Sequence, residues 1–110
     1  MDEFLVILKS LADETRFKII TLLLSHDFCV GALARRLNIS EAAVSQHLRV
    51  LRKAGVVKGE KRGYYTHYWV DRETLKKVAE KIMEIASLTT QREGSCLKTM
   101  SEDCCCGKEG

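Results

Sequence analysis

The chain has 110 residues, of which 45% are hydrophobic and 30% are charged, and its formal net charge is +3. This length allows one small domain with a thin core, so we expect association between chains to bury further apolar surface. No apolar run approaches the roughly 20 residues that a membrane-spanning helix needs. The acidic start Asp2-Glu3 also differs from a basic leader, and we therefore expect a cytoplasmic protein without a membrane partner.

A helix-turn-helix is predicted in the first half of the chain. Residues 30–37 have apolar residues at helical spacing, and Asn38-Ile39 is the short link that such a motif needs. Ser40 suits an N-cap, and Glu41 places a negative charge near the positive end of the following helix dipole. Gly55 can adopt the left-handed conformation that ends this second helix.

The second helix of this motif has two different faces. One face is an apolar stripe that should pack on a core: Ala43, Val44, Leu48, Leu51 and Ala54. The other face carries hydroxyl and amide groups followed by long cations, which suit base edges and phosphates in a major groove. An ordinary solvated helix would show the same pattern, so the segments before and after it must decide between the two interpretations. The candidate DNA contacts on this segment are Ser40, Ser45, Gln46, His47, Arg49, Arg52 and Lys53.

Two β-prone runs, residues 56–58 and 65–70, follow the helix. We expect the charged segment between them, residues 59–63, to form the tip of a hairpin. Such a basic hairpin is a wing that can place Lys61 and Arg62 on a phosphate backbone, with Tyr65 beside them. We expect Tyr68 and Val70 to point into the core, because side chains alternate along a strand.

The positive charge is concentrated on this predicted reading surface. Residues 30–72 carry nine Lys and Arg against three Asp and Glu, whereas residues 1–29 carry three against five. DNA would experience this local excess rather than the small net charge. Because phosphate neutralisation releases counterions, we expect the affinity for DNA to fall steeply as the salt concentration rises.

The two ends of the chain carry further apolar stripes at helical spacing. These stripes can pack within one subunit or between two copies. They are Phe4, Leu5, Ile7, Leu8 and Leu11 near the N-terminus, and Leu75, Val78, Ala79, Ile82, Ile85 and Ala86 near the C-terminus. From Thr89 onward the apolar periodicity is lost, which divides the chain into a domain over residues 1–90 and a flexible tail over residues 91–110.

Four of the five cysteines lie in this polar tail: Cys96, Cys104, Cys105 and Cys106. In a reducing compartment, thiols are more often metal ligands or redox switches than structural disulfides. Thiolates favour soft ions such as As(III), Sb(III), Cd(II), Zn(II) and Cu(I). Three sulfurs satisfy pyramidal As(III), whereas Cd(II) or Zn(II) usually takes a fourth ligand. The tail is therefore interpreted as a metalloid or metal site.

Several motifs together resemble the ArsR/SmtB family of winged-helix repressors. They are LADETRFKII at residues 11–20, Ser45-Gln46-His47-Leu48 with Leu51, Ala54-Gly55-Val56-Val57, and Arg62-Gly63 with Tyr68. The resemblance covers roughly residues 4 to 90. It implies a mainly α fold with a β-hairpin, a homodimer paired through its terminal helices, and double-stranded operator DNA as partner. Glu14 stands where the family often has proline, and this chain contains none.

Thiol-type members of that family carry a Cys-Val-Cys motif and another nearby cysteine before the recognition helix. Here Cys29 remains, while Gly31 and Ala34 occupy the other positions. Cys29 is therefore either a ligand that joins the tail thiols or a buried small hydrophobe. The family's other common site, on the last helix, is not expected because residues 73–90 contain no histidine.

These features predict a transcriptional repressor that leaves its operator when thiolates bind As(III) or Sb(III), with Cd(II), Zn(II) or Cu(I) as other inducers. One alternative is a redox-sensing repressor of the same fold, whose tail would form disulfides. The other is a thiol-based metal carrier or enzyme. No glycine-rich phosphate cradle or Cys-x-x-Cys motif supports catalysis, and a carrier would not need a cationic helix and wing.

Overall fold

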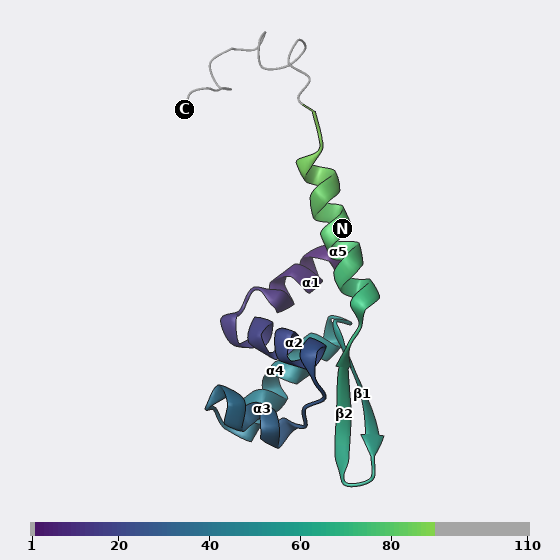
Figure 1. Ribbon diagram of the computed structural model, residues 1–110. Helices are drawn as coiled ribbons and strands as arrows, with labels where there is room; N and C mark the ends of the chain where they lie inside the picture. The colour runs from purple at the N-terminus through teal and green to yellow at the C-terminus, as the bar shows by residue number, and fades with distance from the viewer. Residues whose placement is uncertain (1, 90–110) are drawn as a thin grey trace.

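The computed structural model describes residues 2–89, which form α-helices and one two-stranded antiparallel hairpin (Figure 1). In chain order the elements are α1 (Asp2–Leu11), α2 (Glu14–Ser25), α3 (Val30–Leu37), α4 (Glu41–Lys53), β1 (Val57–Arg62), β2 (Tyr65–Val70) and α5 (Arg72–Ala86). The predicted mainly α fold with a β-hairpin is confirmed. The predicted tail and its four cysteines lie outside the described residues. Between residues 2 and 89, no helix is both long enough and apolar enough to span a membrane.

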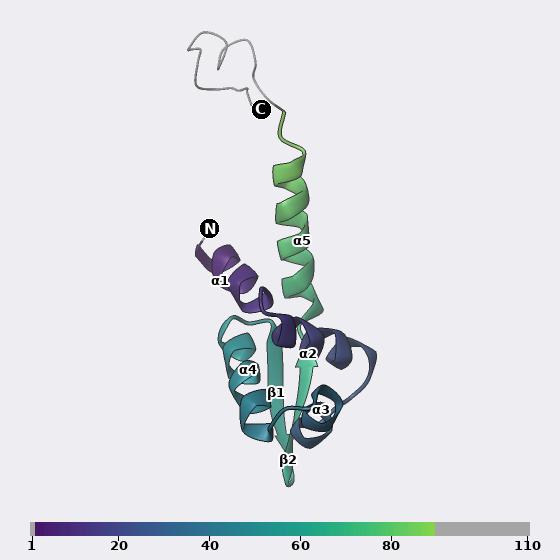
Figure 2. The ribbon, with the colours of Figure 1, turned by 90° about the vertical axis from the view of Figure 1, so that its left-hand side faces the viewer.

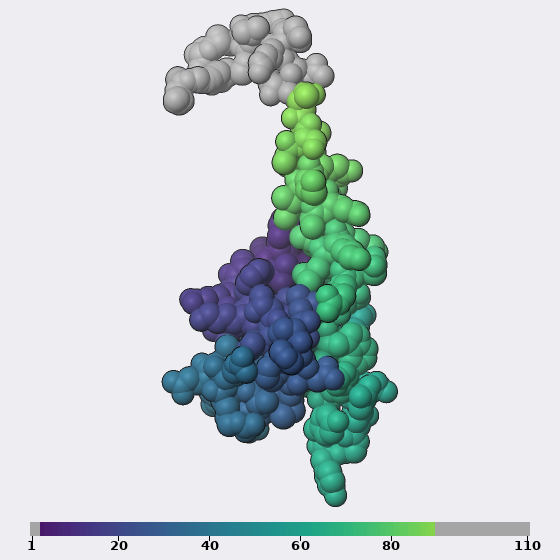
Figure 3. Space-filling view, in the orientation of Figure 1, coloured from purple at the N-terminus to yellow at the C-terminus, as the bar shows by residue number. Residues whose placement is uncertain are grey.

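The hairpin and α5 extend in opposite directions from a compact group formed by α2, α3 and α4. Figure 2 shows the hairpin running along this group, with α1 beside the first part of α5. The space-filling view shows that the second half of α5 projects beyond the rest of the described chain (Figure 3). The recognition helix and the wing therefore lie on the same part of the molecule, far from the end of α5.

Local signals explain where the helices begin and end. The side chains of Asp13, Ser40 and Asp71 each accept a hydrogen bond from a backbone N–H in the first turn of the helix that follows. Asn38 ends α3 with φ of 59°, and Gly55 follows α4 with φ of 84°, both in the left-handed region. The predicted cap at Ser40 and the predicted stop at Gly55 are confirmed.

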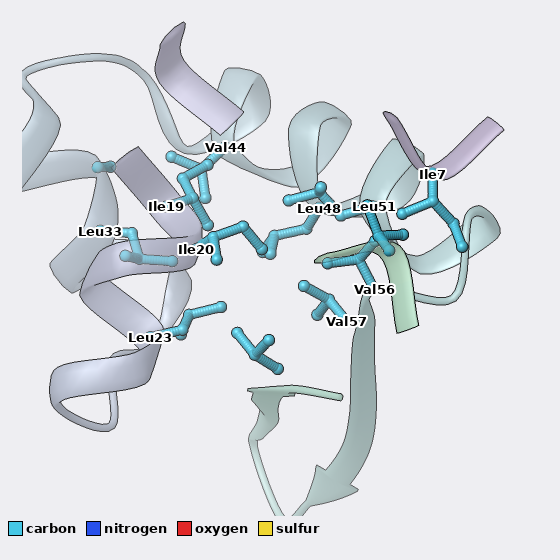
Figure 4. Close-up of a cluster of buried hydrophobic side chains, with 13 residues drawn as sticks. Ile7, Ile19, Ile20, Leu23, Leu33, Val44, Leu48, Leu51, Val56 and Val57 are labelled. Atoms are coloured by element: carbon cyan, nitrogen blue, oxygen red, sulfur yellow. The ribbon is translucent and has the colours of Figure 1, made fainter. Parts of the chain in front are cut away.

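The core lies where α2, α3, α4 and the base of the hairpin meet (Figure 4). Its buried residues are Ile7, Ile19, Ile20, Leu23, Leu33, Ala34, Val44, Leu48, Leu51, Val56, Val57, Val70 and Val78. The apolar stripe predicted for α4 supplies three of them, and none of these three side chains is more than 1% exposed. Val70 is buried and Tyr68 packs against the core, as the strand alternation predicted.

The tip of the wing differs from the predicted one. Gly59 to Arg62 belong to β1, so the tip predicted over residues 59–63 is wrong. Arg62 pairs with Tyr65, which leaves Gly63 and Tyr64 as a two-residue tip with Gly63 at φ of 63°. Gly59 lies within the strand, where a Cβ would stand 3.0 Å from Cε1 of Tyr68. This glycine permits close packing rather than a turn.

Candidate nucleic-acid interface

The exposed face of α4 carries most of the predicted DNA contacts. Ser45, Gln46, Arg49 and Lys53 are all exposed, and the Ser40 hydroxyl caps the start of the helix by accepting from the backbone N–H of the first turn at 3.0 Å. Nη1 of Arg49 donates to Oε1 of Gln46 at 2.8 Å. This contact uses only the amide oxygen of Gln46. Its amide nitrogen is therefore left to donate to a base edge.

A shallow hollow separates α4 from the wing, and no acidic side chain lines it. Its lining residues are Ser45, Arg49, Arg52, Lys53 and Tyr68. The Arg52 guanidinium lies 5.8 Å from the centroid of the Tyr68 ring, a cation–π contact between the recognition helix and β2. The hollow is therefore cationic, and Arg52 also helps to hold the wing beside the helix.

The wing adds cations near its tip. Lys61, Arg62 and Tyr65 are exposed, as their proposed contact with DNA requires. Nη2 of Arg62 lies 3.5 Å from Oε1 of Glu60, and both side chains are more than half exposed. Such a solvated pair contributes little, about 0 to 1 kcal/mol, so Arg62 can exchange this carboxylate for a phosphate. Tyr64 at the tip is fully exposed, and sequence reasoning did not assign it to the interface.

His47 differs from the other predicted contacts on α4. Its side chain is half-buried, and its Nδ1 lies 3.5 Å from Nη1 of Arg16 and 4.0 Å from Oδ2 of Asp13. The hydrogen bond from the backbone N–H of Arg16 lowers the pKa of Asp13 below its usual value of 3.8, and the charges of Arg16 and His47 act in the same direction. In the sequence, Asp13 and Arg16 were noted only as part of the LADETRFKII motif, and no contact was predicted for them.

Cys29 occupies the N-cap position of α3, where its side chain makes no capping hydrogen bond. It is exposed, so the interpretation of Cys29 as a buried hydrophobe is wrong. The neighbouring Phe28 is anchored, because its ring lies 5.6 Å from the Arg36 guanidinium and 6.0 Å from the His26 ring. Among the described residues, no group of three or more His, Cys, Asp and Glu side chains is arranged to hold a metal ion.

Helix, short turn, exposed cationic helix and basic hairpin define the chain as a winged helix-turn-helix protein. Residues 13–58 match the family described as "Bacterial regulatory protein, arsR family". The cadmium resistance transcriptional regulatory protein CadC homolog of Staphylococcus aureus is 37% identical over 87 residues, which cover 74% of this chain and 72% of that relative.

Solved structures agree with this relationship. An ArsR-like transcriptional regulator from Rhodococcus sp. RHA1 has 33% identity and a TM-score of 0.70, over 77% of this chain and 80% of that one. Reduced HlyU from Vibrio cholerae has 32% identity and a TM-score of 0.62, over 79% and 92% of the two chains. The chain belongs to the ArsR family. It is a transcriptional regulator rather than an enzyme.

Proposed function

We propose that this regulator is a homodimeric repressor that binds operator DNA and releases it when its thiolates bind As(III) or Sb(III). Exposed apolar side chains on α1 and α5 support the dimer. They are Leu5, Val6, Ile82, Met83 and Ile85, joined by Leu88 just beyond α5. A monomer gains nothing from exposing such a surface, which is typical of an interface between chains. The proposal retains the cytoplasmic location expected from the sequence.

In this proposal, each subunit presents α4 to a major groove and its wing to the flanking backbone. A two-fold dimer would place the two recognition helices about 34 Å apart, in successive major grooves of a palindrome. Ser45 and Gln46 would contact base edges, while Arg49, Lys53 and the wing cations would neutralise phosphates. The cationic hollow between α4 and β2 supports this assignment, because DNA is the anionic partner that such a surface fits.

The exposed thiol of Cys29 is the observation that carries the inducer proposal. It lies at the start of α3, and α3 packs against the recognition helix. A thiolate–ion bond at this position would therefore act directly on the helix-turn-helix. One thiolate cannot complete the coordination shell, so tail thiolates from Cys96 and Cys104–Cys106 would supply the remainder. The CadC homolog is named for cadmium resistance, which supports a soft ion as inducer.

Arsenite titration against a fluorescent duplex, selected from a random pool by the full-length protein, tests this proposal. We expect saturating arsenite to weaken binding by about 5- to 150-fold, the range of a typical allosteric coupling. Replacing Cys104, Cys105 and Cys106 with serine, or Cys29→Ser alone, should abolish this release and leave the affinity without arsenite unchanged. Unchanged release in the triple variant would exclude the tail as the sensor.

A redox-sensing repressor of the same fold is the second candidate. The exposure of Cys29 favours it equally, because an accessible thiol can be oxidised as well as metallated. Anaerobic, fully reduced protein separates the two candidates. Release by arsenite under these conditions supports the metalloid sensor, whereas release by peroxide alone supports the redox sensor. Cadmium and zinc titrations in the same assay would identify the preferred ion.

A further inference from the structure

Three helices meet at a cluster formed by Asp13, Arg16 and His47, which we call the junction cluster. Nε of Arg16 donates to the backbone oxygen of Ser10 in the last turn of α1 at 2.7 Å. Ser10 is 3% exposed, and its hydroxyl donates to the backbone oxygen of Ile7 at 2.7 Å. The anchor of Arg16 on α1 is therefore partly buried, which strengthens it relative to a bond in open solvent.

The same guanidinium group reaches the recognition helix. Nη1 of Arg16 lies 3.5 Å from Nδ1 of His47 on α4. A guanidinium group can only donate, so this contact is a hydrogen bond in the tautomer of His47 whose ring proton is on Nε2. Because the guanidinium group is planar, its contact with α1 and its contact with α4 have a fixed relative geometry. The movement of α4 relative to α1 is thereby restricted.

Asp13 connects α2 to the junction cluster. Its carboxylate caps α2 by accepting from the backbone N–H of Arg16 at 3.0 Å, and Oδ2 lies 4.0 Å from Nδ1 of His47. Asp13 therefore stabilises the first turn of α2, from which the side chain of Arg16 extends. On α4, His47 follows directly after the exposed Gln46 but faces α2. Together with the buried stripe of α4, this contact holds the rotation of α4 about its own axis, and hence the direction of the exposed face.

We infer that the junction cluster positions the recognition helix relative to α1, and through α1 sets the spacing of the two recognition helices in the dimer. The inference rests on the proposed DNA-binding dimer. His47 is then a positioning residue rather than a base contact. A dimer tolerates little error in spacing, because its half-sites must lie on successive major grooves. Loss of the cluster should relax the spacing requirement without changing which bases are read.

The test compares His47→Leu with Gln46→Leu, its neighbour on the exposed face. Each full-length variant is titrated with the duplex selected by the unaltered protein, and with the same duplex carrying one additional base pair between the half-sites. We expect His47→Leu to reduce the preference for the original spacing by about 10-fold, within the usual range for coupled sites. We expect Gln46→Leu to change base preference within a half-site and to keep the spacing preference.

Two further variants separate positioning from a general loss of structure. Asn at position 47 offers an acceptor oxygen near the place of Nδ1, so His47→Asn should restore the spacing preference. Arg16→Lys keeps the charge but loses the planar fork, so it should resemble His47→Leu. The double variant Arg16→Lys with His47→Leu should show no further loss, because the two residues act through one contact.

Three outcomes would overturn the inference. The first is that His47→Leu keeps the original spacing preference, and the second is that it changes base preference as Gln46→Leu does. A salt dependence reduced by about one charge in His47→Leu would instead indicate a phosphate contact. If His47→Leu does not fold, Arg16→Lys and His47→Asn decide between the same outcomes. If the unaltered protein selects no duplex at all, the proposed function fails first, and the inference fails with it.

Discussion

The helices α4 and α5 are similar in design but differ in what covers them. Each begins after a capping side chain, Ser40 or Asp71, and each has an acidic residue in its first turn. Val44, Leu48 and Leu51 of α4 are at most 1% exposed. In α5 only Val78 is buried, at 5%, while Ile82, Met83 and Ile85 are 46%, 69% and 50% exposed.

This difference shows which parts of the molecule one subunit can complete alone. The orientation of α4 is determined by its own subunit, because α1, α2, α3 and the hairpin all contact it. The second half of α5 has an apolar stripe that nothing in the described chain covers. The helix-turn-helix and its wing are therefore packed within one chain, whereas in the proposed dimer the second half of α5 would be covered by a second copy.

The largest expected effect tests the packing of α4 within its own subunit. Leu51→Ala should lower the free energy of unfolding by about 2 to 5 kcal/mol, because it leaves a cavity in place of a fully buried side chain. Urea denaturation at several protein concentrations provides the measurement. Ile82→Ala is the matched control in α5, and its smaller effect should depend on protein concentration. A Leu51→Ala effect no larger than that of the control would contradict the comparison.

The next effect tests the exposed apolar surface of α5, where we propose that a second copy binds. Ile82→Glu places a charge within the proposed pairing surface and should raise the dimer dissociation constant by at least about 30-fold, the cost of a central interface residue. Sedimentation velocity measures this change, and circular dichroism should show that the helices of the monomer remain. Glu80→Ala, on the exposed polar side of the same helix, is the control and should have little effect. A fully dimeric Ile82→Glu variant would exclude this surface.

The smallest effect compares the two caps. Ser40→Ala and Asp71→Ala should each lower the free energy of unfolding by about 1 kcal/mol, because each leaves a first-turn N–H without its acceptor. Only Ser40→Ala should also weaken binding to the selected duplex, since Ser40 lies at the start of the recognition helix. Thermal unfolding and fluorescence titration measure the two quantities. Equal losses of DNA affinity would show that the effect on binding is a general consequence of lower stability.

Sequence reasoning was most accurate where the signals are local. The helix over residues 30–37, the turn at Asn38, the cap at Ser40 and the stop at Gly55 are all confirmed. Each depends on residues within one turn of the chain. The tip of the wing was predicted wrongly for the same reason. Gly59 resembles a turn signal locally, but its actual role is to contact Tyr68 on the opposite strand.

By itself, the sequence determined the periodicity of the helices, their caps, the alternation of β2 and the location of the positive charge. These properties depend on residue type and on spacing along the chain. Only the tertiary structure decided that His47 faces Arg16, that Arg52 lies over Tyr68, that Cys29 is exposed, and that the C-terminal apolar stripe is buried at Val78 but exposed from Ile82 onward. Each of these depends on which distant segments pack together, and packing is a property of the whole fold.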